Sequence, residues 1–315
     1  MSEPSAESAT PNMLWDITRY AIVAIIAGCL IYFYGFYSPT IYVSREHTGK
    51  TMGTDYIVKV AQFPETGNWQ RIADEIQDRL DALEQMLSNH RQDSEVGRFN
   101  ASTSTDDWFP VSRKTAQVVH TALEISRLTE GAFDIAVAPL KEHVGYEKLS
   151  VCLDSQALKK SIPELTIDLS AIANGFAVDS IAELLDSHKI TDYFIEVGTE
   201  ARGKGRRSRE RDWIAGIEKP SADQFLGMQR TFSLRDQSLA TSRSCSILIS
   251  NGVEEFASVS VLAPTCTRAD TWATAMLVLG EQKGLELANR HGIAVLFLLR
   301  NDDEIREASS NYWGR

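Results

Sequence analysis

Residues 268–280, RADTWATAMLVLG, are the stretch that decides the fold of this chain and the place of its candidate site. Apolar residues recur there at helical spacing, and Gly280 stands where a helix would end. Because residues i and i+4 lie one above the other on a helix, Asp270 and Thr274 share a face. A carboxylate with a hydroxyl suits a hard cation such as Mg²⁺ or Ca²⁺. Alternatively, Asp270 caps the helix and Thr274 bonds back to a backbone carbonyl, and the spacing alone leaves both interpretations open.

The composition of the chain narrows the class of protein. At 315 residues, the chain is long enough for one large domain or two small ones with a complete core. The formal net charge of -11 argues against nucleic acid or anionic lipid as the main partner of the soluble part. The cysteines form no CxxC motif and no ligand-like cluster with the histidines, which argues against a zinc site and a disulfide framework.

The N-terminal region predicts a membrane anchor. Residues 20–44 carry no charge, residues 20–37 are almost wholly apolar, and aromatic residues stand near both ends of the run. Alternatively, residues 26–29 form a lipobox that leaves Cys29 lipidated, although the hydrophobic residues beyond Cys29 favour an uncleaved anchor. We expect the soluble domain on the periplasmic or extracytoplasmic side, but the flanking charges do not fix the orientation. The expected organisation is a tail, a transmembrane anchor, a tether and one domain, at residues 1–19, 20–37, 38–50 and 51–315.

The pattern beyond the anchor predicts an α+β domain. Apolar residues at helical spacing predict a helix at 69–87, Ser112 is placed to cap a second helix that runs to about Thr129, and a third helix is expected at 171–187. The final dozen residues are polar and are expected to be loose. Because helices and strands mix without strict βαβ alternation, the expected fold class is α+β. Strands are expected at 54–61, 192–197, 213–218, 231–234, 246–250, 257–262 and 293–299.

Several short segments resist a purely structural interpretation when they are taken in order. Each alone is more often a cap or a turn. They are Met52-Gly53-Thr54, residues 88–100, Gly131-Ala132-Phe133-Asp134, residues 168–179 (DLSAIANGFAVD), Val197-Gly198-Thr199-Glu200, Ala240-Thr241-Ser242 and residues 269–280. Together they resemble the ApbE-like FAD:protein FMN transferase family over nearly the whole soluble part. The resemblance implies a single ApbE-like, T-fold-related flavin transferase domain behind the transmembrane helix.

The resemblance also implies a chemistry. Members of this family bind FAD and a divalent ion, usually Mg²⁺, cleave the pyrophosphate and attach FMN to a Thr or Ser hydroxyl of a target protein, typically a membrane redox subunit. In physical terms this is phosphoryl transfer. By motif position, the metal ligands would be Asp270, Thr274 and the carbonyl of Ala171. The flavin contacts would be Met52, Ala132, Phe133, Asp134 and Asp168, with His90 and Asn174 at two further positions of the cofactor site.

The sequence departs from the family pattern at several positions. Asn174 replaces the family's lysine, Thr199 replaces a glycine, and His90 stands where an aromatic residue is expected. Only Lys141-Glu142-His143 occupies the place of a longer insert with Trp-Gly-Phe-Gly. The His-x-x-Asp-Pro segment that supplies a histidine to the reaction centre is absent between residues 246 and 257. No catalytic residue is therefore assigned.

Three functions are consistent with these observations. The first is a membrane-anchored, Mg²⁺-dependent FMN transferase, which retention of Asp270 and Thr274 favours. The second is a degenerate relative that serves as a flavin- or metal-binding accessory protein, which the missing lysine and histidine favour. The third is an FAD pyrophosphatase that releases FMN and AMP, a reaction that needs the metal and fewer positioning groups.

Overall fold

The computed structural model describes residues 42–137, 145–218, 228–243, 247–248, 254–301 and 304–314, with 21, 22, 24–26 and 28. The chain forms two compact units, Met1–Tyr42 with Pro64–Thr66 and Val43–Phe63 with Gly67–Arg315. In the first unit, the described residues between 21 and 28 are helical and exposed. Across the described ranges, no helix combines the length and the apolar character needed to cross a membrane. Most of the predicted anchor, including Cys29, lies outside these ranges.

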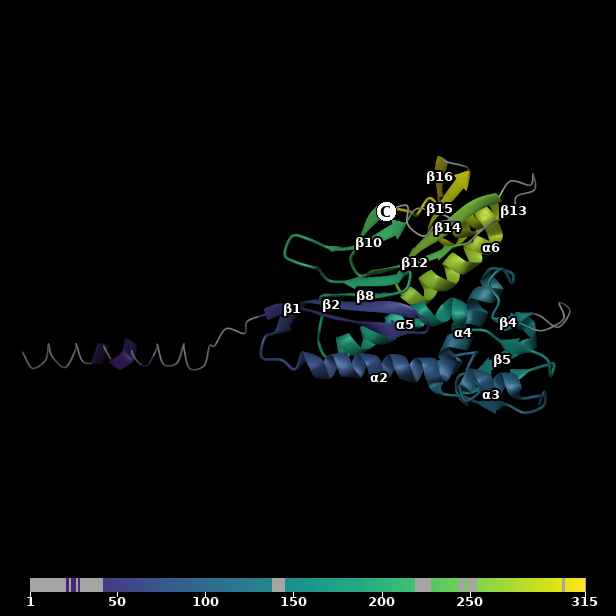
Figure 1. The fold of residues 1–315 in the computed structure, drawn as a ribbon, viewed down its shortest axis with the longest axis horizontal. Coiled ribbons are helices and arrows are strands. Elements are labelled where there is room, and N and C mark those ends of the chain that lie inside the picture. Colours follow the sequence, from purple (N-terminus) through teal and green to yellow (C-terminus); the bar gives the residue numbers. More distant parts are fainter. Residues whose placement is uncertain are drawn as a thin grey trace, which may run out of the picture. The chain divides into compact units, whose positions relative to one another are not determined.

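A long sheet is the framework of the fold (Figure 1). Its strand order is β1-β2-β8-β9-β12-β14-β15-β16, and β13 pairs with β14. Neighbouring strands from β2 to β16 run antiparallel. The strands are β1 (Tyr42–Thr51), β2 (Thr54–Pro64), β8 (Tyr193–Val197), β9 (Glu200–Lys204), β12 (Gln237–Arg243), β13 (Ile247–Leu248), β14 (Glu254–Ala263), β15 (Ala294–Asn301) and β16 (Glu304–Ser309).

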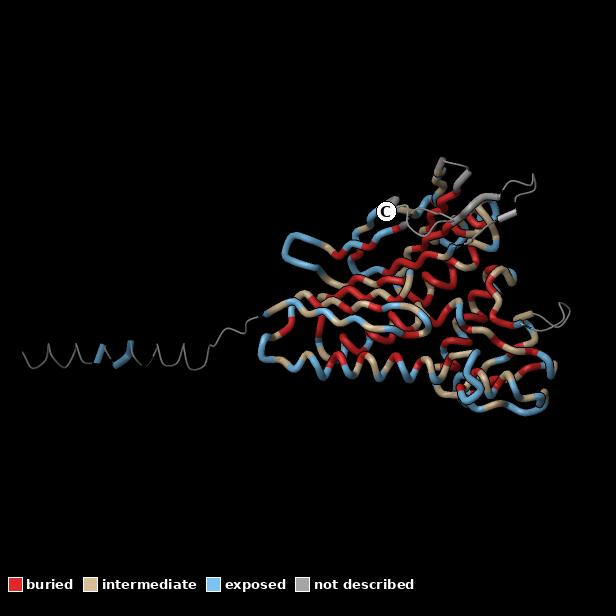
Figure 2. The backbone as a smooth tube through the Cα atoms, viewed as in Figure 1, coloured by how far each residue is buried: buried red, intermediate tan, exposed pale blue. Residues whose placement is uncertain are grey.

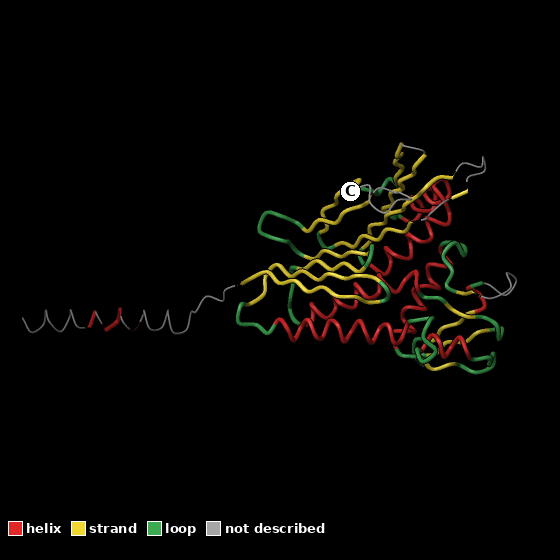
Figure 3. Tube along the Cα trace, in the orientation of Figure 1, coloured by secondary structure: helices red, strands yellow, loops and turns green. Residues whose placement is uncertain are grey.

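The two faces of this sheet pack against different partners because successive side chains of a strand point to opposite faces. In β15, Val295 and Phe297 join the core that the helices cover, whereas Leu296 joins a second core. That second core lies against the antiparallel pair β10 (Trp213–Glu218) and β11 (Met228–Leu234). The order of layers is therefore helices, long sheet and the β10–β11 pair (Figure 3).

The helical layer is made of α2 (Trp69–Leu87), α3 (Glu95–Ala101), α4 (Arg113–Leu128), α5 (Ser170–Ser187) and α6 (Cys266–His291). Three of these helix starts have side-chain caps, from Asn68 at α2, Ser94 at α3 and Ser112 at α4. The side chain of Asn68 accepts a hydrogen bond from the N–H of Arg71, and that of Ser112 from the N–H of Thr115. Smaller elements lie beside the helices: a sheet of β3 (Phe109–Pro110), β6 (Ala157–Lys160) and β5 (Leu149–Cys152), the pair β4 (Ala136–Val137) and β7 (Thr166–Ile167), and the 3-10 turn Tyr146–Lys148.

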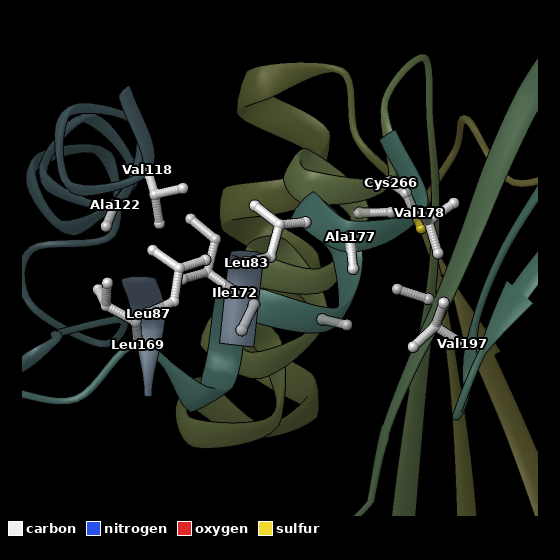
Figure 4. Close-up of a cluster of buried hydrophobic side chains, with 14 of the residues drawn as sticks. Leu83, Leu87, Val118, Ala122, Leu169, Ile172, Ala177, Val178, Val197 and Cys266 are labelled. Atoms are coloured by element: carbon white, nitrogen blue, oxygen red, sulfur yellow. The ribbon is translucent and has the colours of Figure 1, made fainter. Parts of the chain in front are cut away.

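Helix α5 is the centre of the helical layer. It packs on β8 and β9 and also contacts α2, α4 and α6. Figure 4 shows the buried side chains around it, with Leu83 and Leu87 of α2 on one side and Val197 of β8 on the other. A helix that is covered on several sides must be apolar nearly all round, and Figure 2 shows buried residues along the helices and strands that meet there. Anything held by α5 is consequently fixed by the whole domain.

The α+β class and several predicted boundaries are confirmed. Helix α2 and strand β10 have the predicted bounds, and Ser112 caps α4 as expected. The helix around Asp270 is interrupted at Gly280, whose φ of 73° and ψ of 176° are not helical, and then continues to His291. A glycine tolerates this positive φ without steric cost.

The structure differs from two expectations. Residues 42–50 of the predicted tether belong to β1, because alternate side chains of this stretch are partly covered, as in a strand with one packed face. The last dozen residues are not loose, since β16 pairs with β15. Immediately after β16, the Oγ of Ser310 accepts the N–H of Val295 at 3.0 Å, which ties the end of the chain to the sheet.

Candidate functional site

The candidate site lies where α5 crosses α6, and Gly175 makes this crossing possible. A Cβ atom at this position would stand 2.6 Å from the carbonyl oxygen of Cys266 and 2.8 Å from the Cβ of Asp270. Those distances are too short for real contacts, so the observed helix separation requires glycine. The N–H of Gly175 donates a hydrogen bond to Oδ2 of Asp270 at 3.0 Å. The close crossing therefore places the carboxylate of one helix on the backbone of the other.

Two of the three predicted metal ligands, Ala171 and Asp270, lie at this crossing. In an α-helix the N–H of residue i faces the carbonyl of residue i−4, so the carbonyl of Ala171 lies beside the amide that Asp270 contacts. Thr274 follows Asp270 by one turn of α6, and its Oγ1 lies 3.2 Å from Oγ of Ser242 on β12. Carboxylate, hydroxyl and carbonyl oxygens form an all-oxygen donor set of the kind that Mg²⁺ and Ca²⁺ prefer.

The alternative in which Asp270 caps the helix and Thr274 bonds back to a backbone carbonyl is wrong. Helix α6 has Thr265 as its N-cap residue, so Asp270 lies too far along the helix to cap it. The hydroxyl of Thr274 contacts Ser242 on a strand, whereas Thr271 is the residue that bonds back to the carbonyl of Thr267, at 3.0 Å. Both predicted ligands are directed away from their own helix.

Asp270 and Glu200 are two acidic groups buried in the same place, with exposed fractions of 6% and 4%. Burial raises the pKa of Asp270 well above its usual value, and the charge of Glu200 raises it further. Burial also raises the pKa of Glu200, against smaller lowering effects of hydrogen bonds from Thr199 and Asn174. The largest influences on the two pKa values are burial, the charge of Glu200 and hydrogen bonds, and none of these comes from a lysine, arginine or histidine. Two acids buried together without a cation are unfavourable, so a divalent ion fits this site.

A metal ion at this site would depend on few charged ligands. The described part of the chain holds no group of three or more His, Cys, Asp or Glu side chains arranged to bind a metal. One carboxylate, supplemented by hydroxyl and carbonyl oxygens, would leave most of the charge of a divalent ion uncompensated. Mg²⁺ sites of this kind are commonly completed by phosphate oxygens of a substrate.

A pocket of about 500 Å³ opens beside this crossing. It is formed by the turn between β1 and β2, the end of α2 with the loop that follows, and the start of α5. Three of the predicted cofactor contacts, Met52, His90 and Asn174, line it. The full lining is Met52, Gly53, Glu84, Leu87, Ser88, Asn89, His90, Arg91, Ser170, Ala173 and Asn174.

The turn that carries Met52 into the pocket has an unusual backbone. Met52 and Gly53 have φ values of 48° and 77°, and two successive positive φ values are typical of a tight hairpin turn. A positive φ is uncommon for a residue with a side chain and costs about 1 kcal/mol or more. The N–H of Met52 donates to Oε2 of Glu84 on α2 at 3.3 Å. The strained turn is thus held against the helix that forms the opposite wall.

Two departures from the family pattern meet at one carboxyl group. Asn174 lines the pocket, and its side chain also hydrogen-bonds to Glu200. Oγ1 of Thr199 lies 2.7 Å from Oε1 of Glu200 and 2.9 Å from the carbonyl oxygen of Thr241. The N–H of Thr199 donates to Oε2 of Glu200 at 3.2 Å. Asn174 and Thr199 therefore form a polar network that connects the pocket wall to the buried acids.

The remaining predicted flavin contacts lie outside the lining of this pocket. Asp134 has structural partners, because its Oδ1 accepts the N–H of Ala136 at 2.8 Å and its Oδ2 that of Tyr146 at 2.9 Å. Burial raises the pKa of Asp134. Phe133 is only 2% exposed and belongs to the core, which leaves little of its ring for a ligand. Ala132 is partly exposed beside it.

Asp168 lies at the start of α5, next to the pocket residue Ser170. Its Oδ1 accepts the N–H of Ser170 at 2.9 Å, whereas the N-cap position itself is taken by Leu169. Asp168 therefore bonds to the first residue of α5 without occupying the N-cap position. His143, the histidine nearest to the family motifs, lies outside the described residues.

Three residues of the site were not predicted as site residues from the sequence. Gly175 and Glu200 stood inside quoted motifs, and a glycine within an apolar helix was the available signal for a close helix crossing. Ser242 also stood inside a motif, but nothing in its own segment shows that it faces Thr274. These contacts join residues that are far apart in the chain.

Comparison with known proteins identifies one family. Residues 52–297 match the model of the ApbE family. The FAD:protein FMN transferase of Vibrio cholerae serotype O1 is 34% identical over 305 residues, which cover 84% of this chain and 90% of that one. The FAD:protein FMN transferase of Haemophilus influenzae is 30% identical over 307 residues, which cover 84% and 89%.

Solved structures agree with the sequence comparison. The structure of the flavin transferase ApbE from Vibrio cholerae is similar with a TM-score of 0.76 and 32% identity, covering 87% of this chain and 99% of that chain. The apo form of the flavinyl transferase ApbE from Pseudomonas stutzeri has a TM-score of 0.75 and 28% identity, covering 86% and 95%. With the family model, the identity and the fold in agreement, the chain belongs to the ApbE family.

Proposed function

We propose that this chain transfers FMN from FAD to a Thr or Ser hydroxyl of an acceptor protein, with Mg²⁺ as the divalent ion. The observation that carries the proposal is the buried Asp270 carboxylate, which is held on the Gly175 amide at the α5–α6 crossing, beside the 500 Å³ pocket. Relatives at 30–34% identity are named for FMN transfer from FAD to protein, which supports the same reaction here.

The pocket suits the pyrophosphate of a dinucleotide. Ser170 begins the 18-residue helix α5 and lines the pocket, so the positive end of the helix dipole faces the ligand. When bound, Mg²⁺ would neutralise the negative charge that develops on the phosphate oxygens. The bond from Gly175 to Asp270 holds the carboxylate in place, so this ligand needs no rearrangement during the reaction.

The departures from the family pattern favour an enzyme over a degenerate accessory protein. The side chains of Asn174 and Thr199 both hydrogen-bond to Glu200, so these two substitutions leave no polar group of their own without a partner. A site that had lost its function would have no reason to keep two buried acids together, since their burial is unfavourable. FAD hydrolysis to FMN and AMP needs the same metal site and remains the alternative reaction that an assay must separate from transfer.

The location of the reaction is a separate part of the proposal. The uncharged run at residues 20–37 supports a single N-terminal anchor with the ApbE domain on the extracytoplasmic side. An anchored enzyme would act on acceptors at the same membrane surface. We therefore propose a membrane redox subunit as the acceptor class.

The test incubates the full-length chain with FAD, MgCl₂ and the Thr-bearing domain of a membrane redox subunit. Covalent flavin fluorescence on the acceptor in a denaturing gel supports transfer, and Asp270→Ala should abolish it. Asp186→Asn is the matched control, because Asp186 is an acid of α5 that contacts Lys204 and Tyr193 rather than the site. FMN and AMP released without a labelled acceptor would identify a pyrophosphatase, and FAD binding without any product would identify an accessory protein.

A further inference from the structure

Helix α6 is capped by a residue of another helix. Its own N-cap residue, Thr265, makes no side-chain hydrogen bond to the helix start. Instead, Asp179 of α5 accepts the free N–H groups of the first turn: Oδ1 lies 2.9 Å from the N of Cys266 and Oδ2 lies 2.8 Å from the N of Thr267. The hydroxyl of Thr267 also donates to Oδ2, at 2.6 Å. A carboxylate at a helix start satisfies these amides and interacts favourably with the helix dipole.

The same carboxylate is held by the sheet. Nη1 of Arg202 on β9 donates to Oδ1 of Asp179 at 2.7 Å. Arg202 and Glu200 are two residues apart on β9, so both side chains point to the face of the sheet that α5 covers. Strand β9 thus meets α5 and α6 at two places, with Arg202 at Asp179 and Glu200 beside Asp270.

The contacts of Asp179 and Gly175 together form a two-point attachment between the helices. Asp179 follows Gly175 by four residues on α5, and Cys266 precedes Asp270 by four residues on α6. The Gly175–Asp270 and Asp179–Cys266 contacts are therefore separated by four residues, about 6 Å, along both helices. A single contact would let one helix pivot or slide on the other. Two contacts, one turn apart, fix both the angle and the register.

We propose that Asp179 is a positioning residue of the metal site: by capping α6 it holds Asp270 against the Gly175 amide. The effect on metal binding rests on the proposed function, whereas the effect on the Gly175–Asp270 contact does not. Asp179 itself accepts hydrogen bonds through both oxygens, so it has no free oxygen to offer as a ligand.

Asp179→Asn removes this attachment with almost no change in size. The partners of the two oxygens include two backbone N–H groups and a guanidinium, which can only donate. An amide NH₂ in place of either oxygen would therefore face at least one donor. Loss of a group that orients a metal ligand typically weakens metal binding by about 10–100-fold.

The test measures hydrogen exchange of single amides and Mn²⁺ binding in the full-length chain, with Mn²⁺ alone as the probe, followed by electron paramagnetic resonance. In Asp179→Asn we expect the Gly175 amide to exchange faster, as it should in Asp270→Asn, and the Kd for Mn²⁺ to rise about 10–100-fold. The amide of Leu80, buried in the middle of α2, reports global unfolding. Asp186→Asn, seven residues further along α5, should leave the Gly175 amide and the Kd unchanged.

Equal acceleration of the Gly175 and Leu80 amides in Asp179→Asn would mean that the residue only stabilises the fold, and unchanged protection of Gly175 would also overturn the proposal. A third outcome separates the two parts of the proposal. If the wild-type chain binds no Mn²⁺, the metal function is refuted. If the Gly175 amide nevertheless exchanges faster than the Leu80 amide in Asp179→Asn, Asp179 still positions Asp270. If Asp179→Asn does not fold, Thr267→Val removes one of the four bonds, and it should change both readouts in the same direction by a smaller amount. No change in either readout for Thr267→Val would then overturn the proposal.

Discussion

Gly175→Ala separates the stability of this domain from the function of its metal site. The added Cβ would stand 2.6 Å from the carbonyl oxygen of Cys266 and 2.8 Å from Cβ of Asp270, whereas ordinary contact begins near 3.4 Å. The helices must therefore move apart by roughly 0.8 Å, because the atoms in the way are backbone and a Cβ rather than a flexible side-chain end. Overpacking of this kind costs about 1–3 kcal/mol. Replacing a helical glycine by alanine returns about 1 kcal/mol, so we expect a net loss of about 0–2 kcal/mol.

The same shift should be far more damaging to the site. Adding roughly 0.8 Å to the 3.0 Å bond between the Gly175 N–H and Asp270 takes it beyond hydrogen-bonding distance. Because Asp270 then loses its fixed position relative to Ala171, we expect Mn²⁺ affinity and FMN transfer to fall about 10–100-fold. The free energy of unfolding is measured by urea denaturation and Mn²⁺ affinity by electron paramagnetic resonance.

Gly284→Ala is the matched control for this experiment. Gly284 lies on the same helix beyond the break at Gly280, and its added Cβ would meet Cζ of Phe297 at 2.7 Å. It should change stability to a similar extent and leave Mn²⁺ affinity unaltered. Wild-type Mn²⁺ affinity in Gly175→Ala, or an equal loss of affinity in both variants, would refute the reasoning that the close crossing positions the ligand.

Three further predictions concern the acids around the site. In metal-free protein, the stability that protonated Asp270 provides is complete below the pKa of an unfolded aspartate, about 3.9, and is lost as the pH rises through its raised folded-state pKa. Thermal melts in EDTA should therefore show the stability of Asp270→Asn rising relative to that of wild type as the pH rises above about 4, and parallel curves would contradict this. Thr199→Val removes the hydroxyl between Glu200 and the Thr241 carbonyl and should cost about 1–2 kcal/mol in urea denaturation, so an unchanged midpoint would exclude the network. Asp134→Asn replaces one of the two oxygens that accept backbone N–H groups and should lower the free energy of unfolding by about 1 kcal/mol. FAD affinity in a fluorescence titration should not change. Weaker FAD binding at unchanged stability would instead show that Asp134 contacts the flavin.

Local patterns in the sequence predicted the helices that position the site. The apolar spacing at 69–87 corresponds to α2 residue for residue, and Gly280 marks the break in α6. The edge strand β1 consists mostly of polar or charged residues, as is common for strands at the edge of a sheet, so its sequence predicts a tether rather than a strand. The sequence does not predict short strands that contain glycine or arginine, such as β9. These strands are buried by neighbours that are distant in the chain, which a local pattern does not reveal.

The sequence by itself determined that Asp270 and Thr274 share one face of a helix, because a helical repeat depends only on residues a few positions apart. Tertiary structure decided what that face meets. The Gly175 crossing, the burial of Glu200 beside Asp270 and the cap that Asp179 gives to α6 join residues 70 to 95 positions apart. Spacing along the chain carries no information about such contacts, since they exist only once α5, α6 and β9 pack together.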